Sequence, residues 1–553
     1  MQVQTRDDVD AVVHDLLATY GGREVRVAHL LCDRHADDAD RVALLYEDAT
    51  GKTSQLTFAE LRDASARFAG VLRDLGVSRG DRVATLLPKI PELMIATLAI
   101  WRVGAVHVPM FTAFGPRPIR HRLQDSAARV IVTDEQQRPK LNDVLDGPES
   151  LATSAPHAVV VSSGDRQTDH GRDISFWAAL HAARPVQAPA VIGGDDLCFL
   201  IYTSGTTGSA KGVEVPAKAL ASFETYMRFG YDLRDDDVYW NVGDPGWAYG
   251  LYYALVGSLL LGHTTLFYNA PFESEDVYRI LEKYGVTNFA AAPTAYRAMR
   301  AAGAPSGLKE RLRLRAASSA GETLNPDVIA WAKHHLGVPI HDQYGQTEHG
   351  MLVNNHHAPS LRRAIRPGSM GHPMPGFRMV IVDEAGHELG PGQQGQIAID
   401  CPASPLYWFR GYRGAPERTA ERFVGNGRYY LSGDAAYADD DGYIYAGGRT
   451  DDLITSAGYR IGPFDVESAL VAHPAVAEAA VIGKPDALRG EIVKAFVVLK
   501  PGFSAGTALT EELGQFVKTS LSAHAYPREI EIVEGLPKTP SGKIQRFLLR
   551  DRG

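Results

Sequence analysis

The first third of the chain alternates helix-like and strand-like segments. Apolar residues recur at helical spacing along residues 57–75, and Gly76 follows where a helix C-cap belongs. Short apolar runs at 82–87, 105–109 and 130–133 read as strands, and residues 91–103 read as a helix with a proline in its first turn. This alternation predicts an α/β fold with parallel sheets covered by helices.

The pattern changes in the second half of the chain. From about residue 370, short strand-like runs at 379–382, 395–400 and 443–446 predict a β-rich subdomain. From about residue 452, a compact α+β unit follows. Its helices are expected at 463–470 and 509–521, and its strands at 479–482, 493–499 and 529–533. Residues 163–172 are polar and read as a surface excursion.

Length and composition narrow the class of protein. A chain of 553 residues exceeds what one hydrophobic core usually organises, so several domains are expected. The net charge of −9 gives no support to nucleic-acid binding, and three widely spaced cysteines predict neither a disulfide framework nor a cysteine-based zinc site. The N-terminus is acidic where a signal peptide would be apolar, and no apolar run is long enough to span a membrane. We therefore expect a soluble cytoplasmic enzyme.

The segment with the clearest chemistry is 200–212. An apolar strand leads into a loop that is rich in glycine and hydroxyl groups and ends in lysine. Glycines let backbone N–H groups approach an anion, hydroxyls add donors, and Lys211 adds positive charge, which together suit a triphosphate. The spacing is not that of a Walker P-loop. The loop residues concerned are Thr203, Ser204, Gly205, Thr206, Thr207 and Gly208.

This loop resembles the signature of the adenylate-forming superfamily, which includes acyl-CoA synthetases, luciferases and peptide-synthetase adenylation domains. Five more segments resemble family motifs in family order, at 319–323, 342–348, 430–434, 448–454 and 537–543. The resemblance extends over residues 50–547 and is strongest to acetyl- and medium-chain acyl-CoA synthetases. It implies that the activity is ATP-dependent and forms AMP.

The resemblance assigns roles to individual residues. Tyr344 is expected to stack on adenine, Asp434 to bind the ribose hydroxyls, Thr347 to touch the α-phosphate and Glu348 to hold Mg²⁺. Lys543 is expected to be catalytic together with Thr347 and Glu348. The remaining expected ATP contacts are Lys211, Gly321, Glu322, Thr323, Asp342, Gln343, Arg449, Arg460 and the loop residues 203–208.

These roles agree with the chemistry that the reaction requires. A carboxylate attacks the α-phosphorus of ATP, so two anions must be held in line and their charge neutralised. Mg²⁺ prefers one or two carboxylates plus phosphate oxygens, so a lone Glu348 suffices. Lys543 would bridge the attacking carboxylate and the α-phosphate. A lysine acyltransferase that modifies Lys543 would abolish that charge and act as an off switch.

The resemblance also implies a second half-reaction with CoA. It divides the chain into an adenylating domain (1–448), a hinge (449–452) that pivots at Asp451, and a mobile C-terminal domain (453–553). The C-terminal domain would rotate after adenylation and admit the thiol. Gly458 would line the pantetheine tunnel, and Arg122 would help to bind the CoA nucleotide.

The segment 244–250 resembles the acyl-pocket segment of the family, with Trp247 as an aromatic wall. Ala248 stands where amino-acid-activating relatives carry an aspartate, which disfavours α-amino acids. Acetate-specific members carry two tryptophans where this chain has Tyr344 and Gly345. We therefore expect Gly345 to leave an indole-sized extension of the pocket. C3–C8 linear or branched acids, or a small aromatic acid, should then be better substrates than acetate.

Alternative functions on the same scaffold remain open. The acyl group could pass to a separate carrier protein instead of free CoA, or the enzyme could be a luciferase-like oxygenase. A non-catalytic nucleotide-binding protein is a third reading, which the presence of Lys543, Glu348 and the phosphate loop disfavours. The leading prediction is an AMP-forming acyl-CoA synthetase that uses ATP, Mg²⁺ and CoA.

Overall fold

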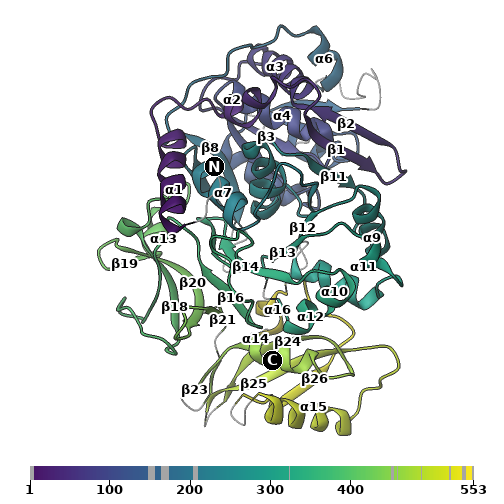
Figure 1. The fold of residues 1–553 in the computed structure, drawn as a ribbon, viewed down its shortest axis with the longest axis vertical. Helices are drawn as coiled ribbons and strands as arrows, with labels where there is room; N and C mark the ends of the chain where they lie inside the picture. Colours follow the sequence, from purple (N-terminus) through teal and green to yellow (C-terminus); the bar gives the residue numbers. More distant parts are fainter. Residues whose placement is uncertain are drawn as a thin grey trace.

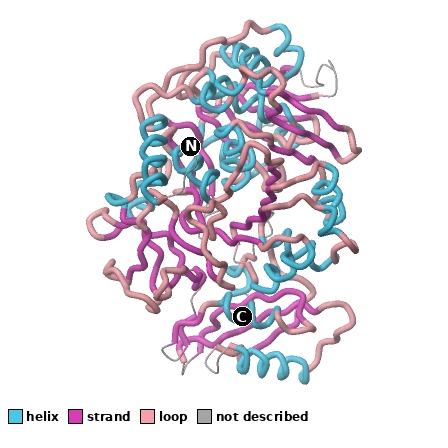
Figure 2. Tube along the Cα trace, viewed as in Figure 1, coloured by secondary structure: helices cyan, strands magenta, loops and turns pink. Residues whose placement is uncertain are grey.

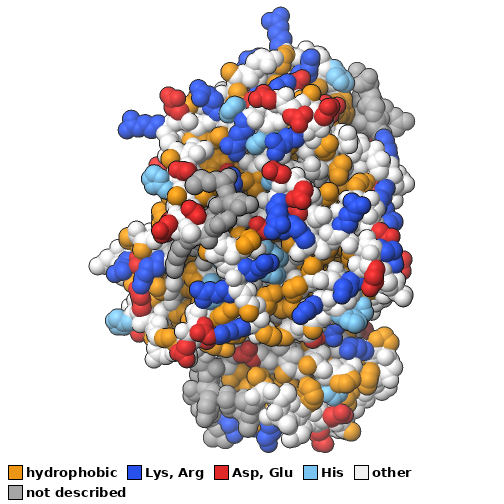
Figure 3. Space-filling view, in the orientation of Figure 1, with side chains coloured by type: hydrophobic (Ala, Val, Ile, Leu, Met, Phe, Trp, Pro, Cys, Tyr) orange, Lys and Arg blue, Asp and Glu red, His pale blue; other side chains and the backbone are white. Residues whose placement is uncertain are grey.

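In the computed structural model, the described residues form three sheets, one of which belongs to a small C-terminal domain (Figure 1, Figure 2). It describes residues 5–146, 156–162, 173–203, 210–322, 324–449, 452, 454–456, 459–486, 489–521, 525–538 and 544–550. Figure 3 shows basic and acidic side chains interspersed over one face. Within the described segments, no helix has the length and apolar character needed to cross a bilayer.

The first sheet has the strand order β7-β6-β5-β3-β4-β8-β9. Its neighbours run parallel except β8 and β9, which are antiparallel. The strands are β3 (Arg82–Leu86), β4 (Val106–Pro109), β5 (Val130–Asp134), β6 (His157–Val161), β7 (Ile174–Ser175), β8 (Leu197–Thr203) and β9 (Lys211–Pro216). The helical segments in this region are α3 (Phe58–Asp74), α4 (Pro91–Arg102), α5 (Pro116–Ser126), η2 (Arg138–Leu141), η3 (Asn142–Asp146) and α6 (Phe176–Ala182).

The second sheet has 14 strands and changes character along its length. One part is mainly parallel: β1 (Val42–Asp48), β10 (Tyr239–Asn241), β11 (Thr265–Asn269), β12 (Asn288–Ala291), β13 (Ala316–Ala320) and β14 (Ile340–Gln346), with β2 (Thr53–Thr57) antiparallel at its edge. The other part is antiparallel: β15 (Gly350–Asn354), β16 (Ser369–Pro373), β17 (Met379–Val382), β18 (Gly395–Asp400), β19 (Phe423–Val424), β20 (Tyr429–Ala438) and β21 (Ile444–Arg449).

The remaining helical segments of the large domain precede the second sheet or connect its strands. They are α1 (Arg6–Tyr20), α2 (Val27–Leu31), η1 (Asp33–His35), α7 (Ala219–Phe229), η5 (Gly250–Gly257), α8 (Ser258–Leu261), α9 (Ser274–Lys283), α10 (Pro293–Ala302), α11 (Leu308–Arg311), α12 (Pro326–His335), η6 (Cys401–Ala403) and α13 (Pro416–Ala420). The segment η5 is a π-helix whose eight residues are all buried. Such segments frequently occur at functional sites.

The C-terminal domain has a sheet and a core of its own. Its strands are β22 (Ile454–Ser456), β23 (Tyr459–Ile461), β24 (Val476–Asp486), β25 (Gly490–Leu499) and β26 (Glu529–Ile532), and its helices are α14 (Pro463–Val471), α15 (Thr507–Ser520) and α16 (Arg546–Arg550). In Figure 1, α14 and α16 lie at the junction with α12 of the large domain. Asn325 at the start of α12 donates to Ser468 on α14 at 3.3 Å.

The α/β fold with parallel sheets, the β-rich region and the small α+β C-terminal unit are confirmed. The start of α3 has a reciprocal capping box between Thr57 and Glu60, and α4 starts with Pro91. The expected strand at 479–482 is longer in the structure, because β24 and β25 form an extended antiparallel pair from Val476 to Asp486. The surface excursion expected at 163–172 lies outside the described residues.

Candidate active site

The candidate site lies where strands of both large sheets end. In the first sheet, β8 ends at Thr203 and β9 begins at Lys211, and these two residues are register partners. The antiparallel pairing therefore brings together the two ends of the segment 204–209. That segment carries the expected loop residues Ser204, Gly205, Thr206, Thr207 and Gly208, and it lies outside the described residues. The expected position of Lys211 at the base of the loop agrees with the structure.

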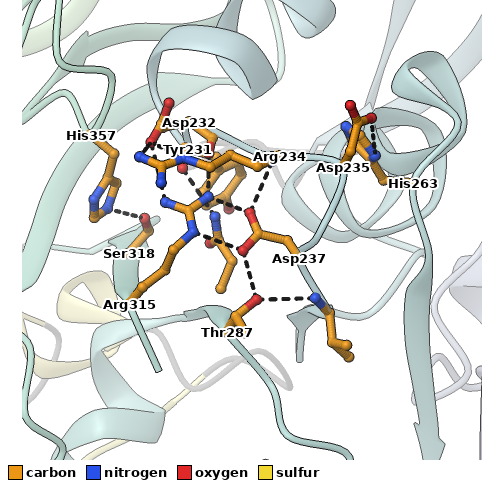
Figure 4. Close-up of polar contacts among 12 residues, drawn as sticks. Tyr231, Asp232, Arg234, Asp235, Asp237, His263, Thr287, Arg315, Ser318 and His357 are labelled. Atoms are coloured by element: carbon orange, nitrogen blue, oxygen red, sulfur yellow. Dashed lines mark hydrogen bonds and ion pairs between the residues drawn. The ribbon is translucent and has the colours of Figure 1, made fainter. Parts of the chain in front are cut away.

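In the second sheet, a network of ion pairs and hydrogen bonds joins the amino ends of neighbouring strands. Figure 4 shows Arg315, just before β13, facing Asp232 and Asp237. Arg315 Nε donates to Asp237 Oδ1 at 2.8 Å, and the Thr287 hydroxyl, just before β12, donates to the same atom at 2.6 Å. Burial alone would raise the pKa of Asp237, but the hydrogen bonds from Arg315 and Thr287 lower it. The network ties the amino ends of β10, β12 and β13, so their carboxyl ends are held in fixed relative positions.

Lys211 and Glu348 are brought to the same place by Tyr412. The Tyr412 hydroxyl donates to Glu348 Oε1 at 2.8 Å, and Lys211 Nζ lies 4.9 Å from the centre of the Tyr412 ring. Burial, followed by the charges of Arg422 and Arg418, lowers the pKa of Lys211. A bound anion such as a phosphate would stabilise the charged form of a lysine in this setting. Sequence reasoning missed Tyr412, which lies 64 residues from Glu348 along the chain.

The residues expected at adenine and ribose also meet. The Tyr344 hydroxyl donates to Asp434 Oδ2 at 2.6 Å, and Gln346 Nε2 donates to the Ser432 carbonyl at 3.0 Å and to Asp434. Tyr344 is half-buried and sits at the end of β14. The structure therefore brings together two residues that are expected to bind adenine and ribose, and Gln346 is a further member of this group that sequence reasoning missed.

Three other expected ATP contacts are partly or fully buried and interact with other residues of the protein. Thr294 and Arg297 hold the Glu322 carboxylate, with Thr294 Oγ1 at 2.8 Å from Glu322 Oε1. Asp342 is buried, and burial raises its pKa well above the ordinary value. Gln343 Oε1 accepts from the Tyr226 hydroxyl, and Gln343 Nε2 donates to Ser318 at 3.4 Å.

The glycine at 321 differs from these residues. Its φ is +101°, and a β-carbon placed there would meet nothing within 4 Å. The backbone at Gly321 therefore borders open space that a flat group could occupy. Thr323, the other residue expected beside the adenine, lies outside the described residues. Thr347 is placed by its backbone, because its carbonyl accepts from the Tyr252 hydroxyl at 3.1 Å.

The expected acyl-pocket segment forms an aromatic wall. The Trp247 ring lies 5.5 Å from Phe111 and 5.7 Å from Phe114, centre to centre. The backbone at Gly246 packs closely against the backbone at Phe111, because a β-carbon on Gly246 would come within 2.4 Å of the Phe111 Cα. Trp247 and Ala248 are both partly exposed, and the fully buried π-helix η5 begins two residues after Ala248. This arrangement suits an apolar acyl group.

The expectation of open space beside Gly345 is wrong. A β-carbon on Gly345 would lie 2.3 Å from the Gly350 carbonyl oxygen and 2.8 Å from Met351 Sδ. The register shifts between Tyr344 and Gly345, and this bulge presses the two arms of the β14–β15 hairpin together. The position that an indole would require is therefore filled by the backbone of the hairpin and by Met351.

The expected CoA and hinge residues are described only in part. Arg122 is buried, with its guanidinium 4.1 Å from the Phe114 ring centre and 5.5 Å from that of Tyr202. Its Nη1 donates to the Pro118 carbonyl at 2.9 Å, and burial lowers its pKa to about 10. The backbone of Arg449 is the register partner of Asp434, and that of Arg460 belongs to β23. Asp451, Gly458 and Lys543 lie outside the described residues.

The groups that the structure brings together suit magnesium and a nucleotide. Glu348 offers one carboxylate, 8% exposed, beside a lysine. One carboxylate completed by phosphate oxygens and water is the donor set that Mg²⁺ prefers. Across the described residues, no cluster of three or more histidine, cysteine or acidic side chains could hold a metal without such a partner.

Comparison with known proteins gives a consistent result. The model of the AMP-binding enzyme family matches residues 32–413, and that of the AMP-binding enzyme C-terminal domain matches residues 465–543. The acetyl-coenzyme A synthetase of Bacillus subtilis is 39% identical over 95% of this chain and 90% of its own. The crystal structure of an acyl-CoA synthetase from Brucella canis is 47% identical, covers 99% of both chains and gives a TM-score of 0.77. An anthranilate CoA ligase in complex with anthranoyl-AMP is 28% identical over 96% of this chain and 97% of that one, with a TM-score of 0.84.

Proposed function

The chain belongs to the AMP-binding enzyme family and is an AMP-forming acyl-CoA synthetase, and from this premise we propose that its acid is larger than acetate. ATP and CoA are its co-substrates. The candidate acids are linear or branched C3–C8 acids and small aromatic acids. Similarity to an acetyl-coenzyme A synthetase and to an anthranilate CoA ligase brackets this range without choosing within it.

The observation that supports a larger acid is the flexible Met351 side chain, which occupies the space beside Gly345 in place of a rigid aromatic cap. Because even a β-carbon would collide with the Gly350 carbonyl, residue 345 provides no aromatic cap over the acyl pocket. Met351 takes that place as the nearest side chain. A methionine is flexible and polarisable, so it adapts to acids of different shape where an indole would exclude them. Trp247, backed by Phe111 and Phe114, forms the opposite aromatic wall in this proposal.

The proposed handling of ATP follows from the two clusters at the strand ends. Tyr344 stacks on adenine and Asp434 binds the ribose hydroxyls. Lys211 and the backbone of 203–208 receive the β- and γ-phosphates, and Thr347 contacts the α-phosphate. Tyr344 and Asp434 are already joined by a hydrogen bond, which fixes the angle between the adenine and ribose sites. Such preorganisation lowers the cost of binding.

Glu348 is the residue that would hold Mg²⁺. The bound ion would neutralise phosphate charge and so help an anionic carboxylate to approach the α-phosphorus. Tyr412 fixes the position of the Glu348 carboxylate through its hydroxyl and supports Lys211 through the face of its ring. In the same proposal, Lys543 contacts the attacking carboxylate and the α-phosphate during adenylation.

The thioester half-reaction is assigned to the same centre after rotation at Asp451. Gly458 would then line the path of the thiol arm, and Arg122 would meet a phosphate of CoA. The buried Arg122 guanidinium has an aromatic face on each side and donates to a backbone carbonyl, so a phosphate would supply the countercharge. A lysine acyltransferase acting on Lys543 would switch off adenylation. We place the enzyme in the cytoplasm, where ATP and CoA are available.

The acid is identified by measuring AMP release with ATP, Mg²⁺ and CoA across acetate to decanoate, isobutyrate and benzoate. The proposal predicts a CoA-dependent maximum at an acid larger than acetate. A maximum at acetate would overturn the proposed substrate class. Pyrophosphate release without any dependence on CoA would contradict free CoA as the acceptor and point to a carrier protein.

The wall assignment has its own test. Met351→Ala should move the maximum toward longer acids and Met351→Phe toward shorter ones, because Met351 fills the space beside Gly345. Each methylene accommodated is worth about 0.8 kcal/mol, or roughly fourfold in kcat/KM between neighbouring acids. An unchanged profile in both variants would show that Met351 does not border the acyl group.

A further inference from the structure

The C-terminal domain contains a half-buried ion-pair cluster that connects three elements. Arg546, the first residue of α16, donates from Nη2 to both oxygens of Glu467 on α14 at 2.8 Å and from Nε to Glu467 Oε1 at 3.1 Å. Arg546 Nη1 also lies 3.5 Å from Oδ2 of Asp452, which precedes β22. The three side chains are between 9% and 19% exposed, so this is not a surface ion pair.

Each partner of Arg546 is itself fixed. Glu467 Oε1 accepts the backbone N–H of Val481 in β24 at 2.8 Å. Asp452 is also paired with Arg550 at the other end of α16. The helix is thus attached at its first turn to α14 and at both ends to Asp452. A bidentate arginine–carboxylate pair has a defined geometry, so it fixes orientation as well as distance.

The position of this cluster in the chain connects it to catalysis. Asp452 is the residue after the expected pivot Asp451, and Arg546 is three residues after Lys543. The segment 539–543 is closed at its base by a bridge between Lys538 and Ile544 and by the Gln545 N–H, which donates to the Pro537 carbonyl at 2.9 Å. The base of the lysine segment and the hinge are therefore connected through the guanidinium groups of Arg546 and Arg550, of which Arg546 also binds Glu467 on α14.

We propose that Arg546 is a positioning residue: it couples the hinge at Asp452 to the base of the Lys543 segment, so that the two move as one body. This inference rests on the proposed role of Lys543 and goes beyond it. If the base of the segment could pivot independently, rotation at the hinge would not deliver the lysine to a fixed place. Misplacement of a catalytic group by about 1 Å can cost roughly 100-fold in rate.

The test measures the two half-reactions separately in the full chain. The first is pyrophosphate release with ATP, Mg²⁺ and the preferred acid. The second is acyl-CoA formation from supplied acyl-adenylate and CoA. Arg546→Gln should slow the first by roughly 100-fold and leave the second within about threefold, because Lys543 acts in adenylation. Arg546→Lys should be intermediate, since an ammonium group cannot reproduce the bidentate pair.

Two further variants separate positioning from folding. Asp452→Asn keeps the pair between Arg546 and Glu467 and removes the ion pairs that Asp452 forms with Arg546 and Arg550. It should slow adenylation about tenfold without slowing thioester formation. Lys484→Gln is the matched control, because Lys484 forms a partly exposed ion pair with Glu529 in the same domain at 2.9 Å. Both of its half-reactions should match those of the unmodified enzyme.

The outcomes distinguish this inference from the function on which it rests. Equal losses of both half-reactions in Arg546→Gln and in Asp452→Asn would overturn positioning and indicate a structural role. Full adenylation in Arg546→Gln, with Lys543→Ala inactive, would overturn the coupling alone. Full adenylation in Lys543→Ala would overturn the coupling together with the proposed role of the lysine.

Discussion

Two half-buried arginines, one in each domain, form similar ion pairs that serve different purposes. Arg315 pairs with Asp232 and Asp237 and joins the amino ends of neighbouring strands within one sheet. Arg546 pairs with Glu467 and Asp452 and joins a hinge to the segment that leads to Lys543. The first network lies at the amino ends of β10, β12 and β13, opposite to the candidate site, so it fixes these strands relative to one another. In our proposal, the second lies between parts that move together.

The comparison shows that an ion-pair network cannot be interpreted from its residues alone. Its place in the topology decides whether it stabilises a fixed scaffold or transmits motion. In the large domain, the residues expected to bind ATP contact side chains that lie far from them in sequence. In the C-terminal domain, the expected catalytic lysine belongs to a single short segment, 539–543, and its position depends on the residues that flank this segment. Substitutions on the two sides should therefore produce different patterns.

The largest effect is expected for Lys543→Ala, on the mobile side. Removal of the positive charge from the α-phosphate should slow adenylation by roughly 1,000-fold. Pyrophosphate release with saturating acid and ATP measures this directly. Lys484→Gln serves as the control for a lost lysine in the same domain. An adenylation rate within a few-fold of the unmodified enzyme would remove Lys543 from the mechanism.

The matching change on the fixed side is Arg315→Gln. It leaves the buried Asp237 carboxylate without its cation, and a lost hydrogen bond to a charged group costs about 1.5–3 kcal/mol of stability. Denaturant unfolding should show this loss. Both half-reactions should keep their ratio in the folded variant. A selective loss of adenylation would make Arg315 resemble Arg546 and break the contrast between the domains.

A smaller effect should follow from Tyr412→Phe. The ring beneath Lys211 remains, while the hydroxyl that holds Glu348 is lost. We expect the half-saturating Mg²⁺ concentration to rise about tenfold, as one hydrogen bond to a charged group implies. The control is Tyr407→Phe, because the Tyr407 hydroxyl has no hydrogen-bond partner among the described residues. The same Mg²⁺ requirement in both variants would contradict the role of Tyr412.

The smallest expected effect concerns pH. Burial raises the pKa of Asp244, the first residue of the expected acyl-pocket segment, to about 6. A carboxyl group with a raised pKa in the folded state binds its proton more tightly when folded, so it favours folding at acid pH and destabilises increasingly as pH rises through 6. Asp244→Asn should therefore raise Tm by roughly 2–4 °C at pH 7 and by much less at pH 4.5. An equal change at both pH values would refute the assignment.

Much of the architecture could be predicted from the sequence because local signals specify it. The capping residues Thr57 and Glu60 and the proline at 91 define helix starts, and the expected strands at 379–382 and 395–400 coincide with β17 and β18. The full length of β24 could not be predicted, because Lys484 to Asp486 is polar and is held in the strand by backbone pairing with β25. The π-helix η5 has no local signal that distinguishes it from a buried α-helix.

The sequence predicts those residues of the candidate site that belong to recognisable motifs. Among the expected residues, Tyr344 contacts Asp434, and Lys211 and Glu348 both contact Tyr412. The support from Tyr412 and Gln346 depends on tertiary contacts over 64 to 88 residues, which no spacing rule reveals. The error at Gly345 has a similar cause. The absence of a side chain at Gly345 predicts free volume, but the hairpin backbone and Met351 occupy that space.

In our proposal, the large domain binds the nucleotide and the acid, and the C-terminal domain contributes Lys543 to adenylation. The most direct measurement is the rate at which Lys543→Ala converts supplied acyl-adenylate and CoA into acyl-CoA. We predict a rate close to that of the unmodified enzyme, because this half-reaction does not use the lysine. A loss as large as the loss in adenylation would contradict the division of labour between the two domains.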